Sequence, residues 1–451
     1  MSHWSDSAVF YHIYPLGLCG APHRNDFTSL PVDRLQVLHS WIGHIRDLGA
    51  NAIYLGPLFE SSTHGYDTAD YGSVDRRLGT KESLASFSSA AHAGGFRLVL
   101  DGVFNHVGRD FWAFRDVLAN GERSRYASWF HLEFGKRSPH GDPFTYEGWS
   151  GHFSLVKLNL ASPEVREHIF GALDGWVRDY GIDGLRLDAA DVMDIGFLKD
   201  LSAHCRRIRP DFWLLGEAVH GDYRKWANPG TLDSVTNYEC FKGLYSSHVD
   251  RNFFEIAYSL NRQFGPTGLY RGLPLYSLVD NHDVNRVANM VTDSRHLHSL
   301  YCLLFTMPGV PSIYYGSEWG IEGKKDGSDW PLRPSLDLDV LSRTAPHPEL
   351  SKTIKRLSEI RQASGPLRSG DYLQLHVSQE QLAFIRTQEG DSVVVVVNAS
   401  QRPVRITLEV PGVNEGCLAD MLNKGEEFPV KTGKAVVDPV PPGWARIMEL
   451  R

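Results

Sequence analysis

The segment KESLASFSSAAHAGGFRLVLDGV (residues 81–103) joins a helix pattern directly to the pattern of a buried strand. Residues 81–93 are rich in alanine and predict a helix, and Gly94-Gly95 is expected to end it because glycine readily adopts the left-handed conformation of a helix C-terminus. Residues 96–103 form a short apolar run, which is typical of a strand covered on both faces. A helix leading into such a strand indicates an α/β fold.

The same alternation extends along most of the chain. Apolar residues at spacings of three and four between Leu38 and Leu48 predict a helix before a strand at 52–55. Ser162-Pro163-Glu164 is typical of an N-cap, a proline at the first helical position and an acid in the first turn. Further strands are predicted at 9–14, 184–188, 212–218, 233–238, 276–282 and 312–316. Eight strands alternating with helices over about 320 residues predict a (β/α)8 TIM barrel, an α/β fold.

Two segments depart from this alternation. Residues 106–160, rich in Gly, Phe, Trp and His, separate the third strand from its helix, and so long a connection is usually a functional insertion. Near the C-terminus, short strand-like runs at 382–387, 392–397, 404–410 and 445–450 are broken by turn residues, which is typical of an all-β module. We predict a barrel at 1–105 and 161–364, an inserted subdomain B at 106–160, and a C-terminal β-sandwich at 365–451.

Composition limits the classes of function. The net charge of -8 gives no indication of a nucleic-acid partner. No apolar run is long enough to span a membrane, and the first residues lack the pattern of a signal peptide. The five cysteines are scattered without a CxxC pair, which disfavours a disulfide scaffold or a zinc site and favours a reducing compartment. The sequence predicts a cytoplasmic protein that binds neither nucleic acid nor membranes.

Polar residues end four of the predicted strands. Active sites of such barrels gather at the carboxyl ends of the strands. The four clusters are Asp101 to His106 on the third strand, Arg186 and Asp188 on the fourth, Glu217 on the fifth, and Asp280 to Asp283 on the seventh. A lone aspartate at a strand end is more often a cap or a loop anchor than a catalyst. Four clusters at one end of one barrel indicate an active site.

The fourth strand shows how the chemistry is arranged. Arg186 and Asp188 are two residues apart and share a face, while Leu185 and Leu187 point toward the helices. An arginine beside a carboxylate is expected to lower the pKa of the carboxyl and keep it ionised. An ionised carboxylate is what a nucleophile requires, so Asp188 is predicted to be the nucleophile.

Glu217 is expected to have a different environment. It follows the apolar residues 213–216, and apolar surroundings raise the pKa of a carboxyl, as a general acid requires. Two carboxylates with pKa values pushed apart are the basis of glycoside hydrolysis. Asp283 would add negative charge beside an oxocarbenium-like transition state. His106 and His282 could hold sugar hydroxyls, although His106 alone could equally be a core histidine.

The clusters together resemble the α-amylase family of glycoside hydrolases. DGVFNH (101–106), GLRLD (184–188), GEA (216–218) and LVDNHD (278–283) are similar to its four short motifs and occur in the same order on strands three, four, five and seven. Supporting matches are YHIYPLG (11–17), HGYDTADY (64–71), KLNLASP (157–163) and PGVPSIYYGSEWG (308–320). The resemblance covers residues 8 to 360. Any one motif is weak, but the ordered set is highly specific.

The resemblance implies a retaining, double-displacement α-glucan glycosidase. Asp188 is similar to the nucleophile, Glu217 to the acid/base and Asp283 to the transition-state stabiliser. Residues that resemble sugar contacts are Arg186, His106 and His282 at the cleaved position, Tyr66 as an aromatic platform with His64 nearby, and Asp329 and Arg333 on the donor side. Retaining chemistry implies that the two catalytic carboxyls lie about 5–5.5 Å apart.

Departures from the family pattern narrow the subgroup. Many members continue the fourth-strand motif with Lys-His, whose histidine carbonyl binds calcium, whereas this chain has Asp191-Val192. This motif is more similar to the cyclomaltodextrinase, neopullulanase and maltogenic amylase group. Thr63 stands where exo-acting α-glucosidases of the family carry an aspartate. The barrel begins by residue 8, without the N-terminal domain of that group, so residues 106–160 are expected to shape the cleft alone.

We therefore expect an enzyme that cleaves α-1,4 or α-1,6 bonds in maltooligosaccharides, cyclodextrins or related cyclic α-glucans, with transglycosylation as a competing outcome. The alternatives are a cytoplasmic α-amylase or a 4-α-glucanotransferase. A non-catalytic family member is disfavoured because Asp188, Glu217 and Asp283 are all present. No cofactor and no metal-binding residue is predicted. Calcium binding and the oligomeric state are left open by the sequence.

Overall fold

The computed structural model describes residues 3–451 and contains the predicted barrel. Its strands are all parallel to their neighbours, in the order β13-β12-β11-β5-β2-β1-β15-β14. They are β1 (Phe10–Ile13), β2 (Ala52–Leu55), β5 (Arg97–Gly102), β11 (Gly184–Leu187), β12 (Trp213–Gly216), β13 (Ser234–Val235), β14 (Tyr276–Ser277) and β15 (Val310–Tyr314). A bridge between Thr236 and Tyr276 joins the two ends of this order. The predicted (β/α)8 barrel is confirmed.

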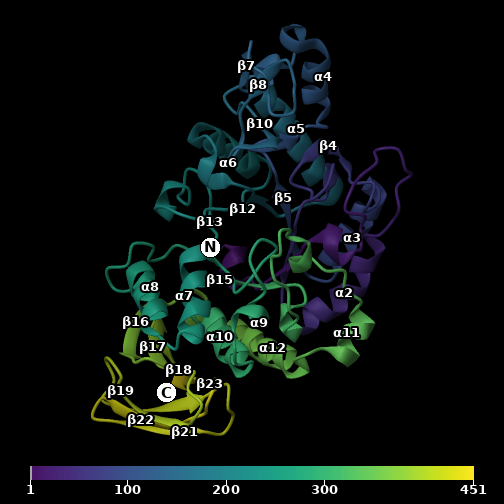
Figure 1. Cartoon of the computed structure of the whole chain (residues 1–451). Coiled ribbons are helices and arrows are strands. Elements are labelled where there is room, and N and C mark those ends of the chain that lie inside the picture. The colour runs from purple at the N-terminus through teal and green to yellow at the C-terminus, as the bar shows by residue number, and fades with distance from the viewer. Residues whose placement is uncertain (1–2) are drawn as a thin grey trace.

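Helices surround the barrel between successive strands (Figure 1). They are α2 (Gln36–Asp47), α3 (Lys81–Ala93), α5 (Pro163–Tyr180), α6 (Ile195–Ile208), α7 (Tyr238–Val249), α8 (Phe254–Phe264), α10 (Arg295–Thr306) and α12 (Pro348–Ala363). Shorter helices are α1 (Pro15–Leu18), α9 (Val287–Met290), α11 (Leu338–Thr344) and α13 (Gly365–Ser369). None of the helices in residues 3–451 is both long enough and apolar enough to cross a membrane.

The helix predicted at 81–93 has the expected bounds. Thr80 and Ser83 form a reciprocal capping box at its start, and Gly95, with φ of 85°, lies just past its end. Helix α5 begins at Pro163 after Ser162, as the sequence predicts. The side chain of Ser162 makes no capping hydrogen bond, so the proline, whose missing N–H suits the first turn, is the stronger determinant there.

The insertion after the third strand contains its own small sheets. Its elements are β6 (His106–Gly108), α4 (Trp112–Asn120), β7 (Leu132–Phe134), β8 (Phe144–Tyr146), β9 (Gly148–Trp149) and β10 (His152–Lys157). Strand β10 pairs with β6 and β9, and β7 pairs with β8. A shorter excursion, β3 (Phe59–Ser61) paired with β4 (Thr68–Val74), follows β2. Both excursions leave the carboxyl ends of barrel strands.

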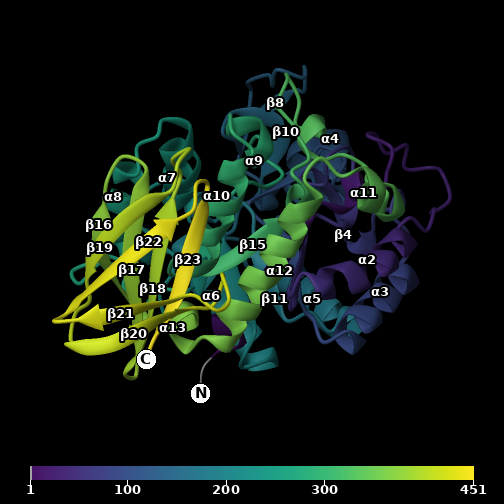
Figure 2. The same cartoon turned by 90° about the horizontal axis from the view of Figure 1, so that it is seen from below.

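The C-terminal part is all-β, as predicted, and lies on one side of the barrel (Figure 2). Its strands are β16 (Asp371–Val377), β17 (Gln381–Gln388), β18 (Asp391–Asn398), β19 (Val404–Glu409), β20 (Glu415–Asp420), β21 (Glu427–Lys431), β22 (Lys434–Val440) and β23 (Trp444–Leu450). They form one antiparallel ladder from β16 to β19, and side chains of β17 and β18 share a core with those of β19 and β22. The domain boundaries and the sandwich given above stay predictions.

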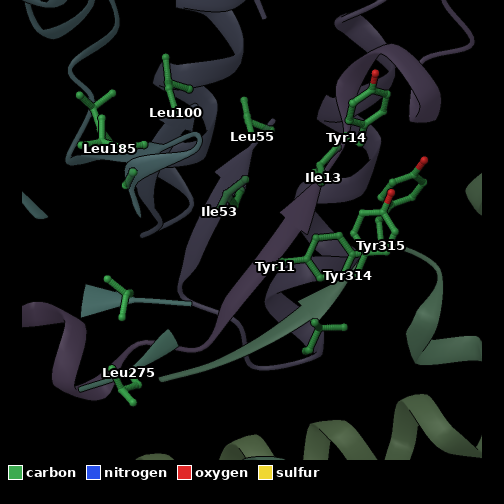
Figure 3. Packing of buried hydrophobic residues seen from close by; sticks show 14 of the residues in the cluster. Tyr11, Ile13, Tyr14, Ile53, Leu55, Leu100, Leu185, Leu275, Tyr314 and Tyr315 are labelled. Atoms are coloured by element: carbon green, nitrogen blue, oxygen red, sulfur yellow. The ribbon is translucent and has the colours of Figure 1, made fainter. Parts of the chain in front are cut away.

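Two apolar layers hold the barrel together. Outward-facing residues of the strands pack against the helices, and Figure 3 shows part of this layer, including Ile13, Ile53 and Leu185. A separate cluster fills the interior, in which the rings of Phe10 and Trp213 stack at 5.0 Å. The interior cluster lies below the carboxyl ends of the strands and supports the polar residues that follow.

Candidate active site

Arg186 is the centre of a buried ion-pair network that joins three strands. Its side chain is only 3% exposed. Nη1 donates to Oδ1 of Asp188 at 2.9 Å and to Oδ1 of Asp101 at 3.1 Å. Nη2 lies 2.9 Å from Oε2 of Glu217. One guanidinium therefore holds the predicted nucleophile and the predicted acid/base side by side, with Asp101 beneath them.

The carboxyl of Asp188 has a different electrostatic environment from the one predicted. Burial raises the pKa of Asp188 well above its ordinary value, and the charges of Glu217, Asp101 and Asp283 raise it further. Arg186 lowers this pKa, as expected, but its charge is shared among three carboxylates. The prediction of a lowered pKa is therefore wrong, because the fourth strand alone reveals neither the burial, which raises this pKa most, nor the acids of the neighbouring strands.

The apolar environment predicted for Glu217 is also wrong. Its carboxylate is bound by Arg186, accepts a hydrogen bond from the amide of Ala189 at 3.2 Å, and lies 3.4 Å from the hydroxyl of Tyr238. The apolar residues 213–215 that precede it are buried in the cores below and around the barrel. Glu217 stands just past the end of its strand, so its side chain meets polar groups at the mouth rather than its apolar neighbours.

Asp283 is held in its charged form from two sides. Nε2 of His282 lies 2.9 Å from Oδ2, and Nη2 of Arg333 donates to Oδ1 at 2.9 Å. Burial raises the pKa of Asp283, but His282, through its charge and its hydrogen bond, and then Arg333 outweigh burial and hold this pKa well below its ordinary value. Asp283 is thus a fixed negative charge at the pocket.

His106 offers a free ring nitrogen at the same place. Its Nε2 lies 3.7 Å from Oδ2 of Asp188 and has no hydrogen-bond partner among residues 3–451. The amide of Asn105 donates to Nδ1 at 3.2 Å, which places the ring hydrogen on Nε2. Burial lowers the pKa of His106 to about 3, so the ring is neutral at neutral pH. A neutral N–H donor beside the nucleophile is suited to a sugar hydroxyl.

Tyr66 lies over the network. Its hydroxyl donates to Oδ2 of Asp101 at 2.9 Å, and its ring stacks on that of His282 with centroids 5.4 Å apart. His64, two residues earlier, accepts a hydrogen bond from the amide of Tyr66 through Nδ1. Thr63 occupies the position at which exo-acting α-glucosidases of the family carry an aspartate. Its hydroxyl donates to Oδ2 of Asp67 at 2.7 Å.

Asp329 and Arg333 flank a single turn of helix, Trp330–Leu332. Nη2 of Arg333 lies 3.4 Å from Oδ2 of Asp329, and Nε donates to the carbonyl of His282 at 3.0 Å. Lys325 pairs with Asp329 at 2.6 Å. Because Arg333 also binds the carboxylate of Asp283, it connects Asp329 to Asp283.

These residues surround a pocket of about 980 Å³. Eight of the predicted site residues line it, namely His64, Tyr66, His106, Asp188, Glu217, Asp283, Asp329 and Arg333. Arg186 and His282 are instead buried beneath it, 3% and 1% exposed, so their direct contact with sugar stays a prediction. The insertion contributes Trp149, His152 and Lys157 to the wall.

The roles of several site residues were not predicted. Asp101 was placed in the third-strand cluster without a role of its own, and the structure shows that it pairs with Arg186 and accepts a hydrogen bond from Tyr54 at 2.7 Å. The period-two alternation that located Arg186 and Asp188 would also have placed Asp101 inside the barrel, two residues after Val99. Trp149 carried no signal, because aromatic residues are common throughout the insertion.

The polar residues of the pocket, all in the described part of the chain, are not arranged as a metal site. Within residues 3–451, no three His, Cys, Asp or Glu side chains are grouped to hold a metal ion. The Asn105 amide bonds His106, and the carboxylate of Asp191 accepts a hydrogen bond from the amide of Val219 at 3.2 Å. The prediction that no metal is required stays a prediction.

Comparison with known proteins places the chain in a class. Residues 33–362 match the family described as Alpha amylase, catalytic domain, and residues 372–442 match the Maltogenic Amylase, C-terminal domain. The first match covers more than half of the chain. The chain therefore belongs to the α-amylase family and is a glycosidase, as its motifs predicted.

Individual relatives are of the predicted subgroup. A cyclomaltodextrinase from Bacillus sp is 32% identical over 419 residues, which are 88% of this chain and 73% of that relative. An intracellular maltogenic amylase from Bacillus subtilis is 29% identical, over 85% of this chain and 66% of its own length. The solved cyclic α-maltosyl-(1→6)-maltose hydrolase from Arthrobacter globiformis is 26% identical, with a TM-score of 0.82 over 100% of this chain and 99% of that one.

Proposed function

We propose that this glycosidase hydrolyses α-1,4 and α-1,6 bonds in maltooligosaccharides and cyclic α-glucans with retention of anomeric configuration. The observation that carries the proposal is the single guanidinium of Arg186, which holds Asp188 and Glu217 at 2.9 Å each on the wall of one pocket. Two carboxylates about 5–5.5 Å apart define the retaining class of glycosidase, and a shared guanidinium keeps them close.

In the first half of the reaction, the carboxylate of Asp188 attacks the anomeric carbon. The bond from that carbon to the leaving oxygen breaks, and Glu217 donates a proton to this oxygen. In the second half, Glu217 takes a proton from water, the water oxygen attacks the same carbon, and Asp188 leaves. Each attack inverts the anomeric centre, so two attacks restore the original configuration.

The remaining residues of the pocket bind and stabilise the sugar. Asp283, held as a carboxylate by His282 and Arg333, supplies negative charge where the ring becomes oxocarbenium-like. Tyr66 offers its ring as a platform, and the free Nε2 of His106 reaches a hydroxyl beside Asp188. His64, Asp329 and Arg333 contact the donor side of the substrate.

The preference for cyclic substrates is supported by the subgroup and not by the catalytic residues, which the whole family shares. The relatives named above include a cyclomaltodextrinase and a cyclic α-maltosyl-(1→6)-maltose hydrolase. Residues of the β9–β10 hairpin, among them Trp149 and His152, narrow the pocket from one side. A 4-α-glucanotransferase remains the second candidate, because a sugar hydroxyl competes with water for the same covalent intermediate.

We propose a cytoplasmic location for the enzyme. The five cysteines are all free and four of them are buried, as in proteins of a reducing compartment. One relative carries the description intracellular.

Product analysis tests the proposed activity. The protein is incubated with β-cyclodextrin, pullulan and soluble starch, with and without a chelator, and the products are separated by chromatography. We expect β-cyclodextrin to be opened and degraded at a rate that the chelator does not change. Rapid thinning of starch with intact β-cyclodextrin would contradict the subgroup, and longer maltooligosaccharides formed from maltotriose without free glucose would favour the transferase.

A further inference from the structure

A second groove adjoins the pocket described above. It has a volume of about 880 Å³ and lies between the loop that follows β12, helix α7 and helix α8, which pack side by side (Figure 1). Its lining includes His220, Tyr223, Glu239, Tyr258, Arg262 and Tyr270. Val219 and Tyr238 line both this groove and the catalytic pocket, so the two hollows adjoin at these residues.

The positions of Val219 and Tyr238, where the groove meets the catalytic pocket, indicate on which side of the scissile bond the groove lies. Val219 follows Glu217 by two residues, and the hydroxyl of Tyr238 lies 3.4 Å from Oε1 of Glu217. In the proposed mechanism Glu217 protonates the leaving oxygen. The groove therefore opens from the leaving-group side, whereas Asp329 and Arg333 belong to the donor side.

The surface chemistry of the groove fits a neutral sugar chain. Phe254, Tyr258 and Arg262 are spaced by four residues and form one row on the outer face of α8. Tyr258 is 68% exposed and lines the groove, presenting a flat ring of the kind that packs on a sugar face. Tyr223 and Tyr270 stack at 5.1 Å in its wall and are themselves buried, so they support the groove and do not face a ligand.

The groove contains charges of both signs, three acids and two bases, and one acid and one base pair with each other. Arg262 pairs with Glu239 at 2.5 Å, and Glu239 donates through its amide to the hydroxyl of Tyr223. Glu255 and Asp222 add negative charge, and Lys242 adds positive charge. A phosphorylated ligand or a nucleic acid would meet acids as well as bases there, while a polyhydroxylated neutral chain finds hydrogen-bond donors, acceptors and the exposed ring of Tyr258.

We propose that this groove binds the leaving-group segment of the α-glucan, so that the enzyme takes long or opened chains with several sugars beyond the cleaved bond. The inference rests on the proposed function and extends it to substrate length. Tyr258 has the most exposed ring in the groove and does not line the catalytic pocket that holds Asp188 and Glu217.

The test uses Tyr258→Ala with Phe254→Ala as its matched control. Phe254 is 50% exposed on the same helix, one turn away, and does not line the groove. Maltoheptaose and maltotriose, each labelled at the reducing end, are digested by both variants and the wild type. Loss of one aromatic contact should reduce kcat/KM for maltoheptaose about three- to tenfold, with maltotriose unchanged. The labelled products of maltoheptaose should also become shorter.

The outcomes separate the inference from the proposed function. If Tyr258→Ala and Phe254→Ala have equal kinetics and equal products on both sugars, the proposed binding of glucan in the groove is wrong. The proposed hydrolase activity would be unaffected by that result. A wild-type protein that cleaves neither sugar would instead refute the proposed function. If Tyr258→Ala changes the mass of the particle in light scattering and leaves the product lengths unchanged, the face binds a second copy of the chain, and the glucan proposal is wrong.

Discussion

The interior of the barrel has two layers that are built from the same strands and differ in chemistry. In the lower layer Phe10, Val99 and Trp213 form a tight apolar cluster. Two residues further along the strands, the upper layer contains Asp101 and Arg186, which are equally buried. Because side chains two apart share a face, one alternating pattern places a hydrophobic floor directly beneath a charged network.

The comparison shows what each layer contributes. Burial of rings in the lower layer stabilises the fold through apolar contact, even though Nε1 of Trp213 has no hydrogen-bond partner among residues 3–451. Buried charges in the upper layer are costly unless they are paired, and Arg186 compensates three carboxylates at once. The upper layer therefore positions reactive groups, and the lower layer supplies stability that the upper layer does not.

The largest expected effect comes from removing a charge at the top of the upper layer. Asp188→Asn and Glu217→Gln each delete a reacting group while keeping its shape, so kcat should fall on the order of 10⁴-fold or more. Initial rates of reducing-sugar release measure this. The control is the thermal unfolding midpoint, which should remain close to that of the wild type. Retained activity in either variant would overturn the assignment of roles.

A substitution in the lower layer should have the opposite profile. Trp213→Ala removes a fully buried ring that stacks on Phe10, and such cavities reduce the free energy of unfolding by about 3–5 kcal/mol. Denaturant titration measures this loss. The rate per folded molecule should stay near the wild-type value, because Trp213 contacts none of the three carboxylates. A stable variant without activity would show that the two layers do not divide their tasks in this way.

A smaller effect is expected in the pH profile of Asp101→Asn. The charge of Asp101 is one of those that raise the pKa of Asp188, so its removal should lower this pKa. Asp188 must be ionised to attack, and kcat/KM falls as the pH drops through its pKa. The acidic limb should therefore move to lower pH by about one unit.

The matched control for this shift is Tyr54→Phe. It removes the hydrogen bond that Asp101 accepts at 2.7 Å but leaves the negative charge in place. Its acidic limb should stay where the wild type has it. A shift of the Asp101→Asn limb to higher pH, or equal shifts in both variants, would contradict the electrostatic account of the upper layer.

Local patterns predicted most of the fold. The strand at 184–188 and the helix at 81–93 follow from alternation and capping alone, since no distant contact is needed to read them. The seventh strand was predicted at 276–282, but only Tyr276–Ser277 pair, because the residues after them leave the ladder to form the site. Strand β21, Glu427–Lys431, was not predicted. Its sequence, EFPVK, contains a proline and two charged residues, which are uncommon in strands.

The site was predicted less completely than the fold. Its residues could be identified by their resemblance to family motifs, and the structure brings them together. The side-chain partners of Asp188 and Glu217 could not be predicted, since Arg186 reaches across to two neighbouring strands. Contacts such as that between Tyr238 and Glu217 join segments distant in sequence and leave no local trace. Electrostatics at the mouth of a barrel is a tertiary property.

The central claim is that Asp188 and Glu217 act as a retaining pair, and the anomeric form of the first product tests it most directly. Proton NMR is recorded during the first minutes of maltoheptaose hydrolysis, before mutarotation equilibrates the new reducing end. We expect the α-anomer to accumulate first and the β-anomer to follow at the mutarotation rate. Initial accumulation of the β-anomer would contradict the account, because it requires a single displacement by water.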